Sequence, residues 1–294
     1  MEYIKTYVTF LKGFLQTSVK IRVLFDCSNG STGLIIKELF QNHENIEIVL
    51  VNDMMDGDFP GHGPNPLDQG VGDFMKAAVT QNKVDMGVVF DGDGDRVFFF
   101  DDLGGPLDSY EVFGYIKKYF KTPYVVDVRA LVEFTMPQEE VIETKVGRYF
   151  VVKAMKEKNA ELGVEYSGHF YFKDFFYTDS GILAAIHMLN YLSELKQDGK
   201  SLSDVKQKNH FVRLSETNFA VVSVDDAISK LSKHFSTQGK TETMDGISVY
   251  TKDFALNARG AATEPVIRFS LVARDTETLQ RVLGEAKEVL GIDA

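Results

Sequence analysis

The 294-residue sequence contains one cysteine, Cys27, so it cannot form an internal disulfide, and this scarcity is typical of a reducing compartment. No run approaches the roughly 18 uninterrupted apolar residues that a membrane-spanning helix needs. The first residues, Met1, Glu2 and Tyr3, do not form the basic segment that precedes the apolar part of a secretory signal. We therefore expect a cytoplasmic protein without a membrane partner.

Positive charge is also scarce, because 32 Lys and Arg face 43 Asp and Glu, for a formal net charge of −11. A protein that binds the nucleic-acid backbone needs a broad basic face, so this balance argues against a nucleic-acid partner. A small phosphorylated ligand needs only a few basic side chains and backbone N–H groups in one pocket. Small phosphorylated molecules therefore remain open as ligands.

Apolar runs alternate with helical patterns over the first two thirds of the chain. We expect strands at 21–25, 46–51, 86–90 and 124–128, and helices at 3–20, 32–40, 73–80, 110–120, 150–159 and 181–195. Such alternation predicts parallel sheets with crossover connections, in which ligands bind beyond the carboxyl ends of the strands.

The last third changes pattern after a polar stretch at 196–209, which is typical of a linker. Beyond it we expect strands at 218–224, 247–250, 255–257 and 266–272, and helices at 225–235 and 276–290. The predicted fold is α/β, with two tandem α/β domains of mixed, largely parallel sheets followed by a small α+β domain. The predicted boundaries are 1–105, 106–209 and 210–294.

The strongest chemical motif is Asp91-Gly92-Asp93-Gly94-Asp95-Arg96, which lies between two apolar runs. Three carboxylates at alternate positions can converge on one hard cation such as Mg2+, and without a cation they would repel one another. Arg96 could then pair with a phosphate oxygen near the metal. A solvated turn is an equally open alternative, because Asp and Gly are common turn formers. An EF-hand fits less well, since its loop ends in a Glu ligand.

A second motif runs from Gly163 to His169 and carries Glu165, Ser167 and His169 at alternate positions. In an extended loop these three side chains would point to one side, where they could bind the hydroxyls of a sugar. A hydrogen-bonded turn without a ligand is the alternative.

A third motif, Arg259-Gly260-Ala261-Ala262-Thr263-Glu264-Pro265, precedes a predicted strand. Its small residues permit close backbone approach, and a guanidinium and a hydroxyl could donate to a phosphate. An ordinary loop before a strand is the alternative.

In this order the three motifs resemble the metal, sugar and phosphate loops of the α-D-phosphohexomutases, the family of phosphomannomutases and phosphoglucomutases. Two further stretches agree with that family, Asp-Phe-Pro-Gly-His-Gly-Pro-Asn-Pro-Leu at 58–67 and Asp-Val-Arg at 127–129. The resemblance covers essentially the whole chain and follows the family's domains two, three and four. It implies reversible movement of phosphate between the 1- and 6-positions of a hexose. A phosphoserine of the first domain makes a 1,6-bisphosphate, which turns over in the cleft.

The resemblance also implies a role for each matching residue. Asp91, Asp93 and Asp95 would bind Mg2+, which neutralises charge at the transferring phosphoryl group. Arg96 would steady that phosphoryl group, and Glu165 and Ser167 would hold sugar hydroxyls. Arg259 and Thr263 would hold the phosphate that is not transferred. His169 and Arg129 would line the cleft and assist proton transfer or charge stabilisation.

Some features of the family are missing. No nucleophile loop like Thr-Ala-Ser-His-Asn-Pro occurs in the sequence, so we expect the phosphoserine domain to come from a separate chain or from a longer form of the gene product. Arg148 stands where the family has His, and Ala261 and Ala262 stand where Ser and Asn or Gly are usual. Each lost hydrogen bond to a charged group costs on the order of 1.5–3 kcal/mol. We expect catalysis to suffer more than ligand binding.

The resulting hypothesis is a phosphohexomutase-family protein that interconverts hexose 1- and 6-phosphates and is incomplete without a phosphoserine domain. Tyr166 in the sugar loop is similar to the mannose and glucose branch of the family, whereas the glucosamine branch usually has Gln. A non-catalytic sugar-phosphate-binding protein is the main alternative, and a phosphatase with Asp91 as nucleophile would leave the other matches unexplained. A flank left uncovered by the missing domain would favour self-association.

Overall fold

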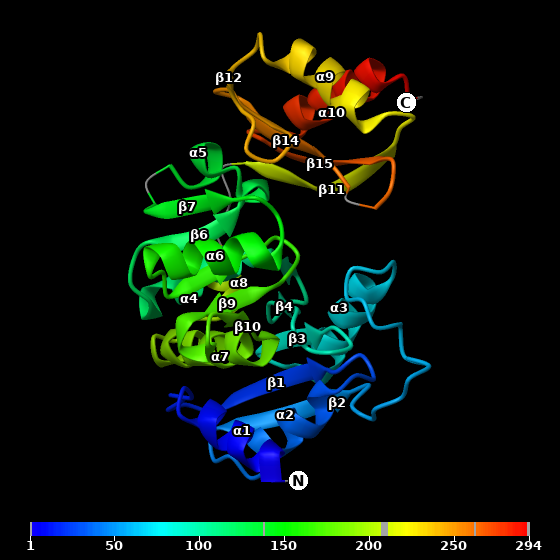
Figure 1. Ribbon diagram of the computed structural model, residues 1–294. Helices are drawn as coiled ribbons and strands as arrows, with labels where there is room; N and C mark the ends of the chain where they lie inside the picture. The colour runs from blue at the N-terminus through cyan, green and yellow to red at the C-terminus, as the bar shows by residue number, and fades with distance from the viewer. Residues whose placement is uncertain (1, 138, 207–210, 262, 293–294) are drawn as a thin grey trace. The chain divides into compact units, whose positions relative to one another are not determined.

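The computed structural model describes residues 2–137, 139–206, 211–261 and 263–292, and Figure 1 colours them along the chain. The chain forms two compact units, each made from two separate segments. Unit 1 comprises Met1–Lys121 and Asn159–Gln207, and unit 2 comprises Thr122–Lys158 and Lys208–Ala294. The predicted fold class is confirmed, since mixed α/β structure is followed by an α+β arrangement at the C-terminus. The predicted domain boundaries stay a prediction.

Unit 1 is built on a five-stranded mixed sheet in the order β2-β1-β3-β4-β5. The strand β1 runs parallel to β2 and β3, whereas β4 and β5 continue antiparallel. The elements are β1 (Ile21–Asp26), β2 (Ile46–Val51), β3 (Met86–Phe90), β4 (Val97–Phe100), β5 (Pro106–Leu107), α1 (Glu2–Lys12), α2 (Thr32–Phe40) and α3 (Val71–Asn82).

Burial explains why these segments adopt their structures. All five residues of β3 are buried, as expected for a central strand covered on both faces. On α3 the buried residues Val71, Met75 and Val79 recur at helical spacing and pack with Leu24 and Val89 of the sheet. The apolar period in the sequence is therefore the one that the core uses.

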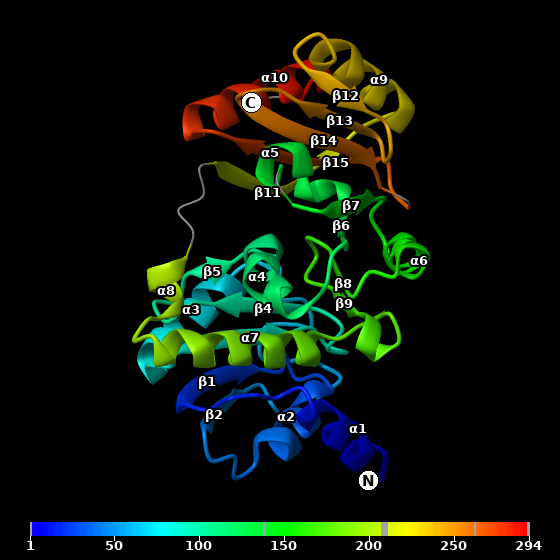
Figure 2. The ribbon, with the colours of Figure 1, turned by 90° about the vertical axis from the view of Figure 1, so that its left-hand side faces the viewer.

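The second segment of unit 1 adds a hairpin and a long helix. Its strands β8, β9 and β10 pair antiparallel. The helix α7 contacts β1 and β4 and lies along the first sheet, as Figure 2 shows. The remaining elements of unit 1 are α4 (Ser109–Ile116), η1 (Lys117–Tyr119), β8 (Leu162–Val164), β9 (Phe170–Phe172), η3 (Lys173–Phe175), β10 (Thr178–Asp179), α7 (Gly181–Gln197) and α8 (Leu202–Val205).

Two predictions about unit 1 were wrong in extent. The helix predicted at 3–20 ends at Lys12, because the following backbone turns its donors toward α7. The N–H of Gln16 donates to Asn190 Oδ1 at 2.7 Å, and the N–H of Ser18 donates to Ser193 Oγ at 3.0 Å. These tertiary hydrogen bonds replace those of a longer helix.

The predicted linker at 196–209 is also partly structured. The helix α7 extends to Gln197, and a capping box at Ser201 starts α8. Within α8, the N–H and the hydroxyl of Ser203 both donate to the carboxylate of Asp102, each at 2.9 Å. The end of the predicted linker lies outside the described residues.

Unit 2 contains a small parallel pair and an antiparallel sheet. The strands β6 and β7 are parallel, and the second sheet has the order β11-β15-β14-β13-β12. The elements are β6 (Tyr124–Asp127), η2 (Val128–Ala130), α5 (Val132–Thr135), β7 (Val141–Thr144), α6 (Arg148–Lys158), β11 (Val212–Ala220), α9 (Val224–Phe235), β12 (Lys240–Glu242), β13 (Ile247–Tyr250), β14 (Phe254–Gly260), β15 (Val266–Ala273) and α10 (Thr276–Leu290).

The helices α9 and α10 cover one face of the antiparallel sheet (Figure 1). On α9 the buried residues Ala227, Leu231 and Phe235 lie four positions apart and face the sheet. The strand predicted at 218–224 is wrong at both ends: β11 begins at Val212 and stops at Ala220, because Ser223 caps α9. In the part of the chain that the structure describes, no helix is long and apolar enough to cross a bilayer.

Candidate functional site

The acidic motif forms the connection between β3 and β4 in unit 1. Side-chain oxygens of Asp91, Asp93 and Asp95 all lie within 4.8 Å of one another, so the three carboxylates do converge. Gly94 makes this possible: its φ is +79°, and a Cβ there would lie 2.3 Å from Cγ2 of Thr32. The loop can therefore curl only with glycine at this position.

Asp91 anchors the loop. Its Oδ1 accepts the N–H groups of Gly94 at 3.0 Å and Arg96 at 3.1 Å, while its Oδ2 accepts Nε of Arg96 at 2.7 Å. Burial raises the pKa of the Asp91 carboxyl to about 6, and Asp95 adds to the rise while Arg96 opposes it. A cation among the three carboxylates would add positive charge to that of Arg96, whose guanidinium forms an ion pair with Asp91.

The side chain of Arg96 is also held by Asn65, a residue for which no role was predicted from the sequence. Its NH1 group donates to Asn65 Oδ1 at 3.1 Å, at the end of the stretch 58–67. That stretch also supports the metal loop directly, because the N–H of Gly92 donates to the carbonyl of Pro64 at 3.0 Å. The agreement of residues 58–67 with the family was the only available sign that Asn65 belongs to the site.

The buried contact between Asp26 and His62 was also not predicted from the sequence. The carboxylate of Asp26, at the end of β1, is fully buried and contacts His62 Nε2 at 2.8 Å. It also accepts the N–H of Ser28 at 2.9 Å and the amide of Asn52 at 3.1 Å. The hydrogen bond that the imidazole donates to Asp26 raises the pKa of His62, and burial partly opposes this rise. Strand order, not sequence spacing, brings these residues together.

The predicted sugar loop is a hydrogen-bonded turn and not an extended segment. It is the tight turn of the β8–β9 hairpin, in which the N–H of Glu165 donates to the carbonyl of His169 at 3.0 Å. Gly168, with φ of +91°, closes the turn. The turn still gathers the three predicted side chains, because Ser167 Oγ lies 2.9 Å and Glu165 Oε2 lies 3.5 Å from Nδ1 of His169.

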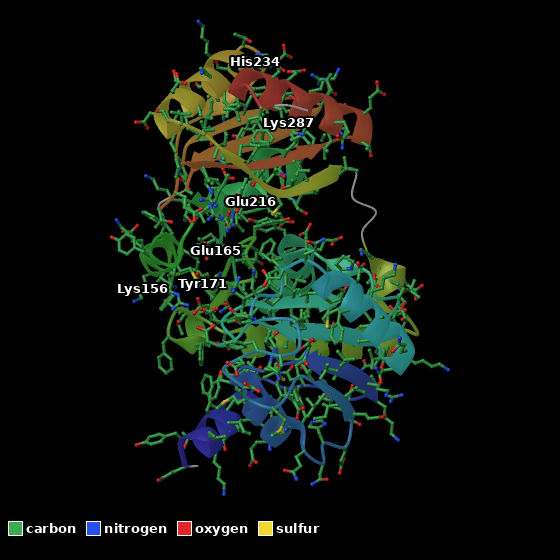
Figure 3. The ribbon with its side chains drawn as sticks, turned by 90° about the vertical axis from the view of Figure 1, so that its right-hand side faces the viewer. Lys156, Glu165, Tyr171, Glu216, His234 and Lys287 are labelled. Carbon is green, nitrogen blue, oxygen red and sulfur yellow. The ribbon has the colours of Figure 1, made fainter. Side chains whose placement is uncertain are left out.

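Glu165 is held from below by an aromatic side chain. Only 2% of Glu165 is exposed, and its Oε2 accepts the hydroxyl of Tyr171 at 2.6 Å (Figure 3). A hydrogen bond to a carboxylate from a rigid ring fixes the orientation of the acceptor. The carboxylate of Glu165 is therefore held in one orientation.

The metal loop and the sugar loop are in contact within unit 1. The N–H of Val97 donates to the carbonyl of Gly168 at 3.0 Å, and Arg96 and His169 form an antiparallel bridge. Nε2 of His169 lies 3.5 Å from Oδ1 of Asp95. A second group that could hold a cation, Asp95 with His169 and Asp179, shares Asp95 with the first. Seven of the predicted site residues thus form one cluster, namely Asp91, Asp93, Asp95, Arg96, Glu165, Ser167 and His169.

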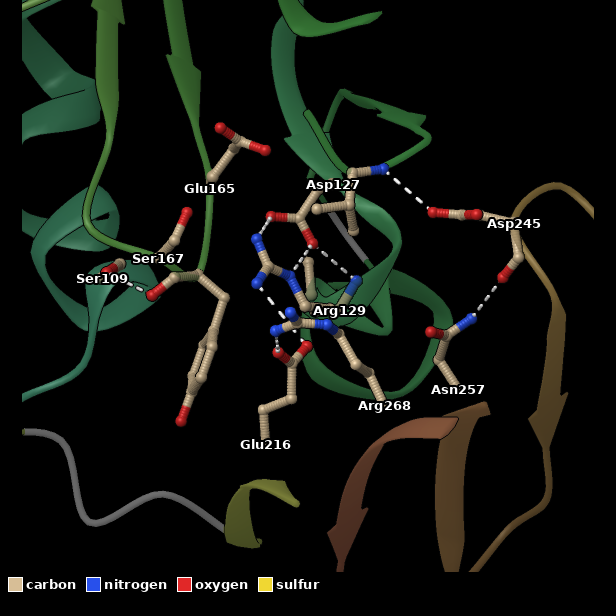
Figure 4. A network of polar contacts seen from close by, with 12 residues as sticks. Ser109, Asp127, Arg129, Glu165, Ser167, Glu216, Asp245, Asn257 and Arg268 are labelled. Atoms are coloured by element: carbon tan, nitrogen blue, oxygen red, sulfur yellow. Dashed lines mark hydrogen bonds and ion pairs between the residues drawn. The ribbon is translucent and has the colours of Figure 1, made fainter. Parts of the chain in front are cut away.

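The other predicted residues belong to unit 2. Arg129 is buried and donates to both oxygens of Asp127, from Nε at 2.8 Å and from NH2 at 2.9 Å. Arg259 is the penultimate residue of β14 and donates from NH2 to Oε2 of Glu216 at 3.0 Å. Figure 4 shows the carboxylate of Glu216 facing Arg129 and Arg268. Glu216 was not among the residues predicted from the sequence.

The predicted phosphate motif begins in β14, with Arg259 and Gly260, and ends at Pro265 before β15. The N–H of Ala261 donates to the carbonyl of Val266 at 2.9 Å, and Thr263 is exposed. Ala262 lies outside the described residues. Arg148, the predicted replacement for a family histidine, is the exposed first residue of α6.

Comparisons with known proteins match two segments of this chain to one family. Residues 1–104 match the model of the phosphoglucomutase/phosphomannomutase alpha/beta/alpha domain II, and residues 132–210 match that of domain III. A phosphomannomutase from Methanocaldococcus jannaschii is 35% identical over 296 residues, covering 96% of this chain and 63% of the relative. The chain belongs to the α-D-phosphohexomutase superfamily.

A second relative and a solved structure are also similar to this chain. A phosphohexose mutase from Xanthomonas campestris is 31% identical over 291 residues, covering 93% of this chain and 63% of the relative. A solved phosphoglucomutase/phosphomannomutase family protein from Burkholderia thailandensis has the same fold, with a TM-score of 0.83 at 24% identity over 98% of this chain and 64% of that one. The chain thus spans about 63% of the length of the curated relatives.

Proposed function

We propose that this chain carries the metal-, sugar- and phosphate-binding parts of a mutase that interconverts hexose 1-phosphates and hexose 6-phosphates. Mannose and glucose phosphates are the proposed substrates, because the first relatives are phosphomannomutases and phosphohexose mutases. The observation that carries the proposal is the contact between the metal loop and the sugar loop. Three converging carboxylates adjoin a preorganised acceptor for a hydroxyl, and a phosphorylated sugar needs both.

We propose Mg2+ as the cation, held by Asp91, Asp93 and Asp95. The donor set fits, since all three ligands are carboxylate oxygens and Mg2+ prefers oxygen ligands. When bound there, Mg2+ supplies positive charge beside a transferring phosphoryl group. The magnesium complex of an N-acetylphosphoglucosamine mutase from Aspergillus fumigatus, which shares the fold with a TM-score of 0.67, is consistent with this choice.

The chain's own residues would then orient the reactants. Arg96, fixed by Asp91 and Asn65, presents its guanidinium beside the carboxylates and steadies the phosphoryl group. Glu165 accepts a sugar hydroxyl, and Ser167 contributes a second hydrogen bond. In unit 2, Arg259 and Thr263 bind the phosphate that stays on the sugar, and Arg129 adds positive charge.

The transfer step needs a phosphoserine, which we propose is supplied by a separate domain. The bond between phosphorus and the serine oxygen breaks, a bond from phosphorus to a sugar hydroxyl oxygen forms, and the serine oxygen takes up a proton to become a free hydroxyl. The hydroxyl proton leaves to a base, for which His169 is our candidate because Ser167, Glu165 and Asp95 hold its ring in place. The reverse transfer from the other position of the bisphosphate completes isomerisation.

Calorimetric titration with glucose 1-phosphate and mannose 1-phosphate, with Mg2+ present, tests the binding part. We expect binding that Arg259→Ala abolishes, whereas Arg281→Ala, which removes an exposed guanidinium from α10, leaves it intact. No binding of either sugar phosphate to the folded chain would refute the proposal.

Adding the purified phosphoserine domain of a relative tests the catalytic part. We expect hexose 1-phosphate to be converted to hexose 6-phosphate only when that domain, this chain and Mg2+ are all present. Binding without any conversion would favour the non-catalytic alternative.

A further inference from the structure

Glu216 occupies an unusual place in strand β11. The register between β11 and β15 shifts between Leu214 and Thr217, so the strand bulges there. A bulge re-aims the side chains at its extra residue. Here Glu216 contacts Arg268 on the adjacent strand β15 and Arg259 on β14, the strand beyond it.

Those two arginines form a like-charge pair. Arg259 of β14 and Arg268 of β15 are direct cross-strand partners, which repel each other unless an anion lies between them. The carboxylate of Glu216 is that anion in this structure. Its Oε2 accepts NH2 of Arg259 at 3.0 Å, and its Oε1 accepts NH1 of Arg268 at 3.3 Å.

A third guanidinium completes the group. NH1 of Arg129 lies 3.6 Å from Oε2 of Glu216, while the rest of that guanidinium binds Asp127. The side chain of Glu216 is 14% exposed and that of Arg259 is 11% exposed, so water screens the contact only weakly. Among these described residues, the three guanidinium groups and the carboxylates of Asp127 and Glu216 together carry one net positive charge, and two if Glu216 is neutral.

Arg259 also has hydrogen-bonding capacity that Glu216 does not satisfy. Its Nε is buried and has no acceptor in the part of the chain that the structure describes. A guanidinium presents its donors in a fork that suits two oxygens of one anion. A phosphate, with more oxygens and more charge than a carboxylate, could satisfy both the fork and the excess positive charge.

We propose that Glu216 is an internal competitor for phosphate at these arginines. In the ligand-free chain the carboxylate neutralises Arg259 and Arg268, and an incoming phosphate replaces it. Glu216 therefore weakens phosphate binding and ensures that the arginine pair is not left without a counter-anion when ligand leaves. This inference rests on the proposed function, in which Arg259 binds the phosphate of the substrate.

Calorimetry with inorganic phosphate at constant ionic strength tests the competition. We expect Glu216→Gln to bind phosphate on the order of tenfold more tightly than the wild type, because a charged hydrogen-bonding competitor is removed. Glu288→Gln makes the same charge change at an exposed position of α10 and should leave the affinity unchanged. Combining Glu216→Gln with Arg259→Ala should remove the gain.

Unchanged or weaker phosphate binding by folded Glu216→Gln would overturn the proposal, because Glu216 would then only position the arginines. If that variant does not fold, Glu216→Asp retains the charge on a shorter side chain. It should still bind phosphate more tightly than the wild type, and equal affinity would count against us.

Titration with glucose 1-phosphate separates this inference from the proposed function. Wild-type binding that depends on Arg259 but is no tighter in Glu216→Gln would refute the competitor and leave the function intact. Tighter inorganic phosphate binding by Glu216→Gln, with no hexose phosphate bound by any variant, would support the competitor and refute the function.

Discussion

His187 makes a quantitative prediction about the stability of unit 1 at low pH. The imidazole, on α7, lies among four aromatic rings whose centroids are 4.9 to 6.2 Å away, and its Nδ1 is buried without a hydrogen-bond partner among the described residues. Burial lowers the pKa of this group to about 4, from an ordinary value near 6.5. The folded protein therefore holds the ring neutral at pH values where the unfolded chain protonates it.

The sign of the effect follows from linkage. At pH 7 the imidazole of His187 is mostly neutral in both the folded and the unfolded protein, so it has almost no effect on the free energy of unfolding. As the pH falls below about 6.5 only the unfolded state binds the proton, so the free energy of unfolding decreases. For these two pKa values the loss is about 2 kcal/mol at pH 5 and about 3 kcal/mol below pH 4.

The free energy of unfolding of the wild type and of His187→Phe is measured by urea unfolding at each pH. Hydrogen exchange of the backbone amides in α7 is measured as a second readout. Phenylalanine fits the aromatic surroundings and cannot titrate, so the difference between the two proteins isolates this group. We expect His187→Phe to gain about 2 kcal/mol relative to the wild type between pH 7 and pH 5. A difference that does not change with pH would refute the reasoning.

Three further predictions concern the loops of unit 1. Asp93→Asn removes one carboxylate from the metal loop, and calorimetry should show the Kd for Mg2+ rising on the order of tenfold. An unchanged Kd would show that Asp93 is not a ligand of the cation. Asn65→Ala releases Arg96 from its hydrogen bond and should lower kcat about tenfold in the reconstituted assay, with Mg2+ affinity unchanged; loss of Mg2+ binding instead would assign Asn65 to the metal. Gly168→Ala places a Cβ 2.8 Å from the ring of Phe98 at a φ of +91° and should lower the free energy of unfolding by about 1–3 kcal/mol, so a neutral melting curve would contradict this geometry.

Most strands and helices could be predicted from the sequence because their apolar period matches the core. The strand at 86–90 and the helix at 276–290 have the predicted bounds, since continuous burial and a helical stripe leave little choice. The helix predicted at 3–20 failed because Asn190 and Ser193, far along the chain, accept hydrogen bonds from the backbone of Gln16 and Ser18. Local periodicity carries no sign of such partners.

In the candidate site too, local spacing predicted some contacts, whereas contacts with residues far along the chain were not predicted. Converging carboxylates at 91, 93 and 95 could be expected from their spacing, and the structure brings them together. Asn65, the Asp26–His62 pair and Glu216 reach their partners through strand order or a bulge, neither of which a sequence pattern specifies. The spacing at 165, 167 and 169 fits an extended loop and a hydrogen-bonded turn equally well, so it left both open, and the structure contains the turn.

The chain passes between its two units three times, after Lys121, Lys158 and Gln207. A protease that cuts at any one of these places would therefore produce two fragments still bound through the interior of at least one unit. The nicked chain should migrate as one species under native conditions and as two in denaturant. Cutting after Lys158 gives fragments that each contain part of both units, so two polypeptides covering 1–158 and 159–294 would have to fold together. The same connectivity makes the chain a natural starting point for a split-protein reporter.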